Sequence, residues 1–251
     1  MDNAAGYAPV SRGAGAVSVA SVSSIDRPVL VIRDRAHWYA YGGKLYPSVT
    51  TLLKGWPKPK LIGWAAEATA EYAIRQRVKM FAIAEGSGEE AAMEILKNSR
   101  FQTSDKAKRK GSDIHAIIAA GTEPPSDLRP YVDPYHRWIR EHQVEVIAQE
   151  VPIINLTEGY GGTADLVCRF AGMTWVIDLK TGTGVYPEYH AQVAAYAHAE
   201  HGLPVPVDAG GVLHLAETGP ALHIVDLEPA YRAFLAAAEV ARYIGLVKEE
   251  T

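Results

Sequence analysis

The sequence predicts an α/β fold in which a mixed central β-sheet is flanked by helices. Strand-forming runs, rich in apolar and β-branched residues, occupy 144–154, 163–170, 174–179, 209–215 and 222–225. Ala171-Gly172 has the chemistry of a tight hairpin turn, and Pro187 favours the first turn of a helix that extends to Ala199. Strands and helices in this order are typical of a sheet covered by helices.

The part of the chain before this sheet is expected to be mainly helical. Short strands are predicted at 29–32, 38–41 and 45–49, and helices at 61–80, 89–96, 105–120 and 128–142. The Gly-Ser-Gly run at 86–88 is predicted to be a loop, and Ser104 to cap the helix at 105–120, which Gly121 ends. A closing helix is predicted at 229–247.

The 251 residues fall into two parts by composition. Residues 1–26 are predicted to be a flexible tail, and residues 27–251 a single domain with a helical segment at 57–142. The one cysteine, Cys168, excludes an internal disulfide and a four-cysteine iron–sulfur cluster. We expect no membrane contact and a cytoplasmic location, because the sequence has neither a spanning apolar stretch nor a secretory signal.

Basic residues gather in the helical segment. Residues 54–110 hold 12 Lys and Arg against 7 Asp and Glu, although the whole chain has a net charge of −4. Lys106, Lys108, Arg109 and Lys110 fall in the first turns of the helix predicted at 105–120, where the helix dipole disfavours cations. The pattern is compatible with contacts to a phosphate backbone, and about equally with a solvated helix surface.

Two acids and a lysine occupy notable positions in the hairpin. Side chains alternate along a strand, so Asp178 and Lys180 are expected on the same side of the sheet. If hairpin pairing brings Asp165 alongside, two carboxylates and an amine meet, and such oxygen ligands suit Mg²⁺ or Mn²⁺. An isolated Asp-x-Lys is more often a plain ion pair. Glu150, in the preceding strand, is expected to orient this site rather than to bind metal.

Two stretches resemble nucleotide-binding motifs in sequence but lack the structural context or the residue order that these motifs require. Residues 159–164 fit the G-x-G-x-x-A fingerprint, but a strand and not a helix is predicted after them. The run Lys180-Thr181-Gly182-Thr183-Gly184 reverses the order of a phosphate-binding Walker loop. We therefore expect no ATP and no dinucleotide.

Four motifs in order resemble the RecB-like branch of the PD-(D/E)XK nuclease superfamily, which includes phage and mitochondrial exonucleases. They are Gly111-Ser112-x-x-His115, Gly162-x-x-Asp165, Asp178-Leu179-Lys180 and Gln192-x-x-x-Tyr196. The resemblance implies a restriction-endonuclease-like core and a catalytic set of Asp165, Asp178, Lys180, Gln192 and Tyr196. It also implies metal ligands from His115, Asp165, Asp178 and the carbonyl of Leu179. Ala164 replaces the proline of the superfamily pattern.

This resemblance implies a Mg²⁺-dependent DNA exonuclease of recombination, repair or phage replication, in which Mn²⁺ substitutes for Mg²⁺. DNA is the expected partner, and a recombination or replication protein is compatible as a second one. Two alternatives stay open: a structure-specific or restriction-type endonuclease, and a catalytically silent DNA-binding subunit. Strand polarity and oligomeric state are not readable from these motifs.

Overall fold

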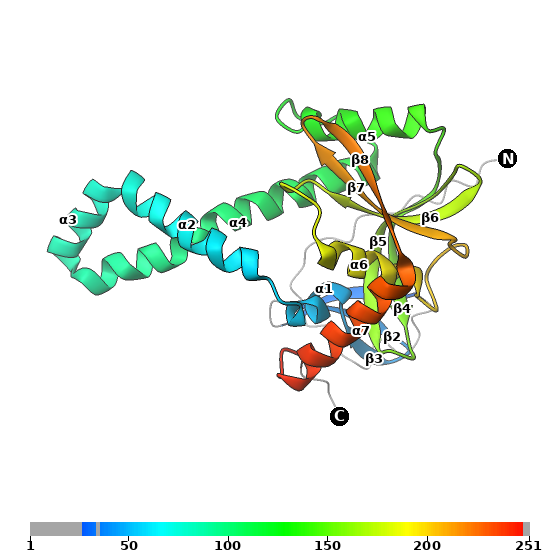
Figure 1. Ribbon diagram of the computed structural model, residues 1–251, viewed down its shortest axis with the longest axis horizontal. Coiled ribbons are helices and arrows are strands. Elements are labelled where there is room, and N and C mark those ends of the chain that lie inside the picture. Colours follow the sequence, from blue (N-terminus) through cyan, green and yellow to red (C-terminus); the bar gives the residue numbers. More distant parts are fainter. Residues whose placement is uncertain (1–26, 34–35, 248–251) are drawn as a thin grey trace.

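The computed structural model describes residues 27–33 and 36–247 (Figure 1). The tail predicted at 1–26 lies outside these described residues. The chain folds into a five-stranded sheet, a smaller three-stranded sheet and a long helical arm. The fold is therefore mixed α/β.

The larger sheet has the strand order β4-β5-β6-β7-β8. Its strands are β4 (Glu145–Asn155), β5 (Tyr160–Phe170), β6 (Met173–Lys180), β7 (Ala209–Ala216) and β8 (Gly219–Val225). β6 and β7 run parallel and are joined through helix α6 (Pro187–Ala197), whereas the other neighbouring strands pair antiparallel. The mixed sheet predicted from the sequence is confirmed.

A tight turn joins β5 to β6, as predicted. Ala171 and Gly172 have φ values of 49° and 75°. Two successive residues with positive φ are the geometry of the hairpin turn that best matches strand twist. The register of the two acidic strands is therefore set locally by this turn.

Helices cover both faces of the larger sheet. One core lies against α6, α7 (Leu227–Tyr243) and the short helix α1 (Val49–Leu52), with Tyr160 and Phe234 fully buried in it. The other lies against α5 (Arg129–Glu141) and the end of α4, and includes Ile114 and Trp138. In the part of the chain that is described, no helix is long and apolar enough to cross a membrane.

The smaller sheet packs against β5. Its strands are β1 (Val29–Arg33), β2 (Ala36–Tyr41) and β3 (Lys44–Pro47), in that order, and a bridge between Ser48 and Gly161 links it to the larger sheet. The predicted strand 45–49 is too long at its end. The Ser48 side chain accepts a hydrogen bond of 3.0 Å from the backbone of Thr51 and so caps α1, which starts at Val49 and continues into the 3-10 helix η2 (Leu53–Gly55).

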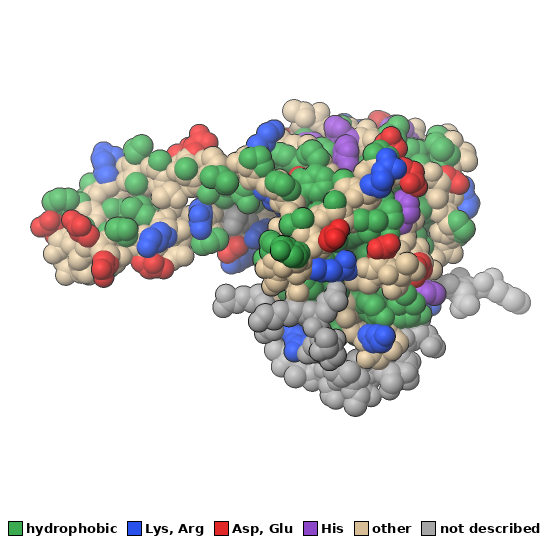
Figure 2. Space-filling model, turned by 60° about the horizontal axis from the view of Figure 1, so that its bottom comes forward, with side chains coloured by type: hydrophobic (Ala, Val, Ile, Leu, Met, Phe, Trp, Pro, Cys, Tyr) green, Lys and Arg blue, Asp and Glu red, His purple; other side chains and the backbone are tan. Residues whose placement is uncertain are grey.

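The helical arm extends away from both sheets (Figure 1). It consists of α2 (Pro59–Arg75), α3 (Arg77–Ser87) and the first half of α4 (Glu89–Ala120). The predicted helix 61–80 is confirmed as helical but not as continuous, because the backbone leaves helical geometry at Gln76 and divides it into α2 and α3. The predicted loop 86–88 shrinks to Gly88, which has a φ of 92°. α2 buries no residue, and apolar and charged side chains intermix on the arm (Figure 2).

Helix α4 replaces two predicted helices, 89–96 and 105–120. Its 32 residues run without a break through position 104, so the predicted cap at Ser104 is wrong. Packing of α2 and α3 along its first half sustains the helix where the sequence suggested an interruption. Lys106 to Lys110 therefore lie in mid-helix, where the dipole argument for a special role does not apply. Gly121 ends the helix in the left-handed conformation, as predicted.

Candidate metal and catalytic site

The two acidic strands part at Asp165. β5 and β6 pair as far as Leu166 and Ile177. Beyond that point Oδ2 of Asp165 accepts a hydrogen bond of 2.7 Å from the backbone N–H of Leu179. The carboxylate thus stands where the next ladder bond would be, and it brings Asp165 to the end of the strand that carries Asp178.

Three side chains from three elements face one another beside this point. They are His115 of α4, Glu150 of β4 and Asp165 of β5, and one ligating atom from each lies within 4.8 Å of the others. Nδ1 of His115 is 3.5 Å from Oδ1 of Asp165 and 3.8 Å from Oε1 of Glu150. Glu150 has a φ of 49°, so strand β4 is locally distorted where it presents this carboxylate.

The His115 ring is held by a backbone carbonyl. Its Nε2 lies 3.0 Å from the carbonyl oxygen of Leu179. Because a carbonyl only accepts, Nε2 carries the proton in this hydrogen bond. In the neutral ring the lone pair is then on Nδ1, the atom that faces Asp165 and Glu150. This arrangement orients an imidazole for metal binding through Nδ1.

Asp178 and Lys180 form a buried ion pair next to the cluster. Nζ of Lys180 is 2.5 Å from Oδ2 of Asp178, which confirms that both side chains lie on one side of the sheet. Asp178 is 0% exposed, and among the described residues neither of its oxygens accepts a hydrogen bond of normal geometry. A buried carboxylate with unused lone pairs is available to a further cationic or donor group.

Burial and mutual charge shift the protonation of all these groups. Burial works to lower the pKa of His115, but the Asp165 carboxylate overcomes it and raises that pKa to about 9. Burial, reinforced by Asp165, raises the pKa of Glu150 to about 7. Burial also raises the pKa of Asp178 to about 6 against the opposing charge of Lys180. These shifts reflect several negative charges held close together: Asp165 and Asp178 are buried, whereas the Glu150 side chain is 43% exposed, so solvent weakens its shift.

For Asp165 and Lys180, neighbouring opposite charges outweigh the effect of burial on the pKa. Burial works to raise the pKa of Asp165, but His115 and Lys180 hold it below its usual value. Burial works to lower the pKa of Lys180, but Asp178 and Asp165 hold it above its usual value. Lys180 is therefore an ammonium group at neutral pH.

The donor set fits a hard divalent cation. Two carboxylates and one imidazole converge, and the unsatisfied Asp178 carboxylate lies close by. The ligand set in the structure differs from the predicted one at three residues. Glu150 joins His115 and Asp165, Asp178 lies outside the group of three, and the Leu179 carbonyl is engaged by His115.

Gln192 and Tyr196 form a buried pair on α6. Nε2 of Gln192 donates a hydrogen bond of 2.8 Å to the hydroxyl of Tyr196, and Gln192 is only 8% exposed. Gln192 is therefore an interior residue, because α6 turns this face onto the sheet. Burial, with the charges of Asp178 and Asp165, raises the pKa of Tyr196 well above its usual value, so its hydroxyl is a neutral neighbour of the site.

Two glycines of β5 allow tyrosine rings to approach the site. A Cβ added at Gly161 would lie 2.5 Å from Cβ of Tyr39, and one at Gly162 would lie 2.6 Å from Cε1 of Tyr196. The hydroxyl of Tyr39 is 2.7 Å from Oγ1 of Thr163. These glycines sit within a strand, so the fingerprint at 159–164 serves close packing and not a dinucleotide turn.

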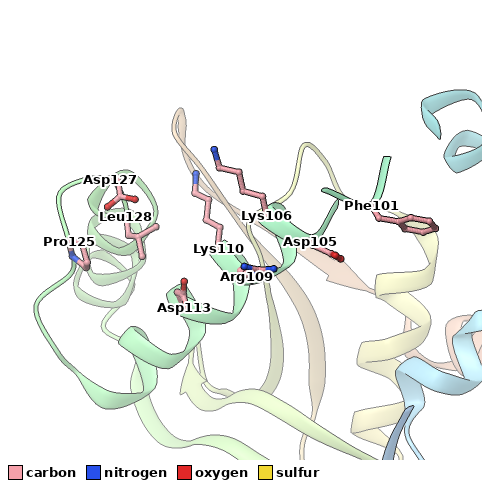
Figure 3. Close-up of a pocket in the computed structure, with 9 residues that line it drawn as sticks. All are labelled: Phe101, Asp105, Lys106, Arg109, Lys110, Asp113, Pro125, Asp127 and Leu128. Carbon is pink, nitrogen blue, oxygen red and sulfur yellow. The ribbon is translucent and has the colours of Figure 1, made fainter. Parts of the chain in front are cut away.

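The basic residues of α4 do not all face the site. Lys106, Arg109 and Lys110 line a cavity of about 630 Å³ with three carboxylates, Asp105, Asp113 and Asp127 (Figure 3). They precede His115 by nine, six and five residues, which at 3.6 residues per turn places them on other faces of the helix. Lys108, seven residues before His115, shares the face of that histidine. The mixed charge of the cavity makes it a poor site for a polyanion.

Glu150 is the cluster residue that the sequence did not predict as a metal ligand. Its place in the strand before Asp165 was the available signal, because antiparallel neighbours of an acidic strand lie next to its carboxylates. Its register, with Gln149 opposite Leu166 and Val151 opposite Ala164, sets Glu150 across from Asp165. The irregular backbone that aims it inward is not encoded in any local pattern.

Comparisons with known proteins add little to this geometry. No protein-family model and no curated protein matches the chain. A solved structure described as "Crystal structure of SSO0001" is similar, with 15% sequence identity, a TM-score of 0.36, and coverage of 78% of this chain and 75% of that one. A likeness of this size says nothing about activity, so the function rests on the residues of the site.

Proposed function

We propose that this protein is a Mg²⁺-dependent deoxyribonuclease of the RecB-like PD-(D/E)XK type that acts as an exonuclease in DNA recombination, repair or phage replication. The observation that carries the proposal is the convergence of His115, Glu150 and Asp165 next to the buried Asp178–Lys180 pair. All four motifs on which the family resemblance rests contribute to this one region of the fold.

The residues have distinct roles in this proposal. His115, Glu150 and Asp165 would hold the metal ion, and Asp178, whose Oδ2 pairs with Lys180, would offer Oδ1 to the same centre or to a water. A Mg²⁺ ion held by these residues would supply polarisation of a phosphate and a lower pKa for a water molecule. Lys180 stays an ammonium group because of Asp178, so it donates a hydrogen bond to the phosphate or to the attacking water rather than removing a proton.

The backbone of β6 positions two of these groups directly. His115 is oriented by the Leu179 carbonyl, and Asp165 by the Leu179 N–H, so a single residue of β6 fixes two of the cluster residues. Tyr196 and Gln192 are buried beside the site, where the charges of Asp178 and Asp165 act on Tyr196. Burial on this side strengthens the charge interactions of Asp165 and Asp178.

The test is cleavage of linear and covalently closed circular DNA in Mg²⁺. We expect cleavage of linear DNA only, loss of activity with a chelator, and a fall of about a hundredfold or more in Lys180→Ala. Lys44→Ala, at an exposed lysine of β3, is the matched control and should retain activity. Cleavage of circular DNA would support the endonuclease instead, and no cleavage in Mg²⁺ or Mn²⁺ would contradict the proposal.

A further inference from the structure

A chain of aromatic and cationic contacts leads outward from Lys180. Its Nζ lies 4.9 Å from the ring centroid of Tyr189. The Tyr189 ring meets the Tyr186 ring edge to face, with centroids 5.6 Å apart. Nζ of Lys60 lies 5.9 Å from the Tyr186 centroid. We call Tyr189, Tyr186 and Lys60 the tyrosine path.

The path follows from how α6 and α2 begin. Pro187 starts α6, so Tyr186 precedes the helix and Tyr189 lies in its first turn, where its N–H bonds the Tyr186 carbonyl at 2.9 Å. Lys60 is in the first turn of α2, at the root of the arm. The two helix starts are tied by an ion pair of 3.7 Å between Lys58 and Glu188. This ion pair engages Glu188, the acidic residue in the first turn of α6.

The two tyrosines have different surroundings. The ring face of Tyr189 is taken by Lys180, which makes Tyr189 a positioning residue for that ammonium group. Tyr186 is partly exposed, and Lys60 is exposed and only at the outer limit of a cation–π contact. Tyr186 and Lys60 are therefore accessible to a ligand, and they offer it a π-face and a positive charge.

This combination matches one kind of nucleic acid. A ring that stacks a base, beside a lysine that meets a phosphate, is the basis of single-strand binding. A duplex keeps its bases stacked on one another inside the helix and presents mainly phosphates to a protein. We infer that the tyrosine path receives single-stranded DNA, with a base on Tyr186 and a phosphate on Lys60, and leads that strand to Lys180. The inference rests on the proposed nuclease function and specifies its substrate.

The experiment measures binding without turnover. Fluorescence anisotropy in a metal chelator would compare a labelled single-stranded oligonucleotide with a blunt duplex of the same sequence. Tyr186→Ala should weaken single-strand binding about fivefold or more and duplex binding less than twofold, whereas Tyr186→Phe should keep it. Lys60→Ala should reduce the salt dependence of single-strand binding by about 0.7 in log–log slope. Tyr243→Ala removes a tyrosine that is 92% exposed at the end of α7 and serves as the control.

The outcomes separate this inference from the nuclease proposal. Tyr186→Leu keeps apolar bulk without a π-face, so a loss equal to that of Tyr186→Ala, in a protein with the wild-type melting temperature, supports stacking. If the wild-type protein cuts no DNA but binds single strands through Tyr186, the nuclease proposal fails and the tyrosine path stands. Unchanged single-strand binding in Tyr186→Ala, or an equal loss for duplex, would overturn the path.

Discussion

Nε2 of His115 donates a hydrogen bond to the carbonyl oxygen of Leu179 across 3.0 Å. The backbone N–H of the same residue, Leu179, donates a hydrogen bond to Asp165. One residue of β6 therefore fixes a histidine of α4 and an aspartate of β5 relative to each other through the two peptide groups that flank it. Their mutual geometry depends on the backbone of the central hairpin and not on flexible side chains.

This relationship predicts the effect of removing the histidine. His115→Ala should weaken Mn²⁺ binding by about tenfold or more, because the lone pair of Nδ1 is lost from the cluster. Asp165→Asn should weaken it further, since a neutral amide is a poor ligand for a hard dication. Electron paramagnetic resonance of free Mn²⁺ measures both. His223→Ala, at an exposed histidine of β8, should bind as the wild type does. Unchanged Mn²⁺ binding in His115→Ala would make His115 a packing residue.

Glu150 provides an independent test of the cluster. Glu150→Gln should reduce Mn²⁺ affinity about tenfold or more and lower cleavage in Mg²⁺ accordingly. In a chelator its melting temperature should not fall, because the amide replaces a carboxylate that is crowded by Asp165. The matched control is Glu145→Gln, an exposed carboxylate of the same strand whose partner is Arg169. A variant that binds metal normally would show that Glu150 only orients the site, as the sequence suggested.

The parts of the site that were predictable are those set by neighbours in the sequence. Asp178 and Lys180 share a side because strands alternate, and their strand pairs with β5 because Ala171-Gly172 forms the turn. Glu150 depends on a register and a distorted φ angle that only the assembled sheet supplies. The place of Glu150 in the cluster therefore follows from the folded sheet and not from its neighbours in the sequence.

The helical arm shows the same limit on a larger scale. Local composition suggested a break before the basic residues of α4, but tertiary packing against α2 and α3 carries the helix through it. Conversely, Gln76 interrupts a run that looked like one continuous helix. In this arm, propensity predicts which segments are helical, whereas packing decides whether a helix is continuous.

Burial of the Gln192–Tyr196 pair changes what its removal should do. Gln192→Ala leaves the Tyr196 hydroxyl without its donor and creates a cavity, so the free energy of unfolding should fall by about 1–3 kcal/mol. Tyr196→Phe should cost about 1 kcal/mol. A double-mutant cycle by thermal unfolding should give a coupling energy of about 1 kcal/mol or more. Additive losses would show that the 2.8 Å hydrogen bond contributes nothing of its own.

The basic residues of α4 allow a prediction that separates two faces of one helix. Lys108 lies two turns before His115, on the same face and about 10 Å along the axis. Lys106 and Lys110 line the cavity on other faces, and Nζ of Lys110 lies 3.7 Å from the ring centroid of Tyr131. Under the proposed nuclease function, we expect a strand bound at the metal site to pass Lys108 and not to reach the other two.

Lys108→Ala should therefore raise the dissociation constant for DNA and reduce the log–log salt dependence by about 0.7–0.9, the contribution of one phosphate contact. The ion pair of Lys108 with Asp105, 3.9 Å long and exposed, is too weak to offset this loss. The double variant Lys106→Ala/Lys110→Ala is the control: it removes twice the charge from the same helix and should leave the slope unchanged. A larger effect in the double variant than in Lys108→Ala would place the DNA on the cavity side of α4. Equal slopes in the wild type, Lys108→Ala and the double variant would mean that these lysines only solvate the helix.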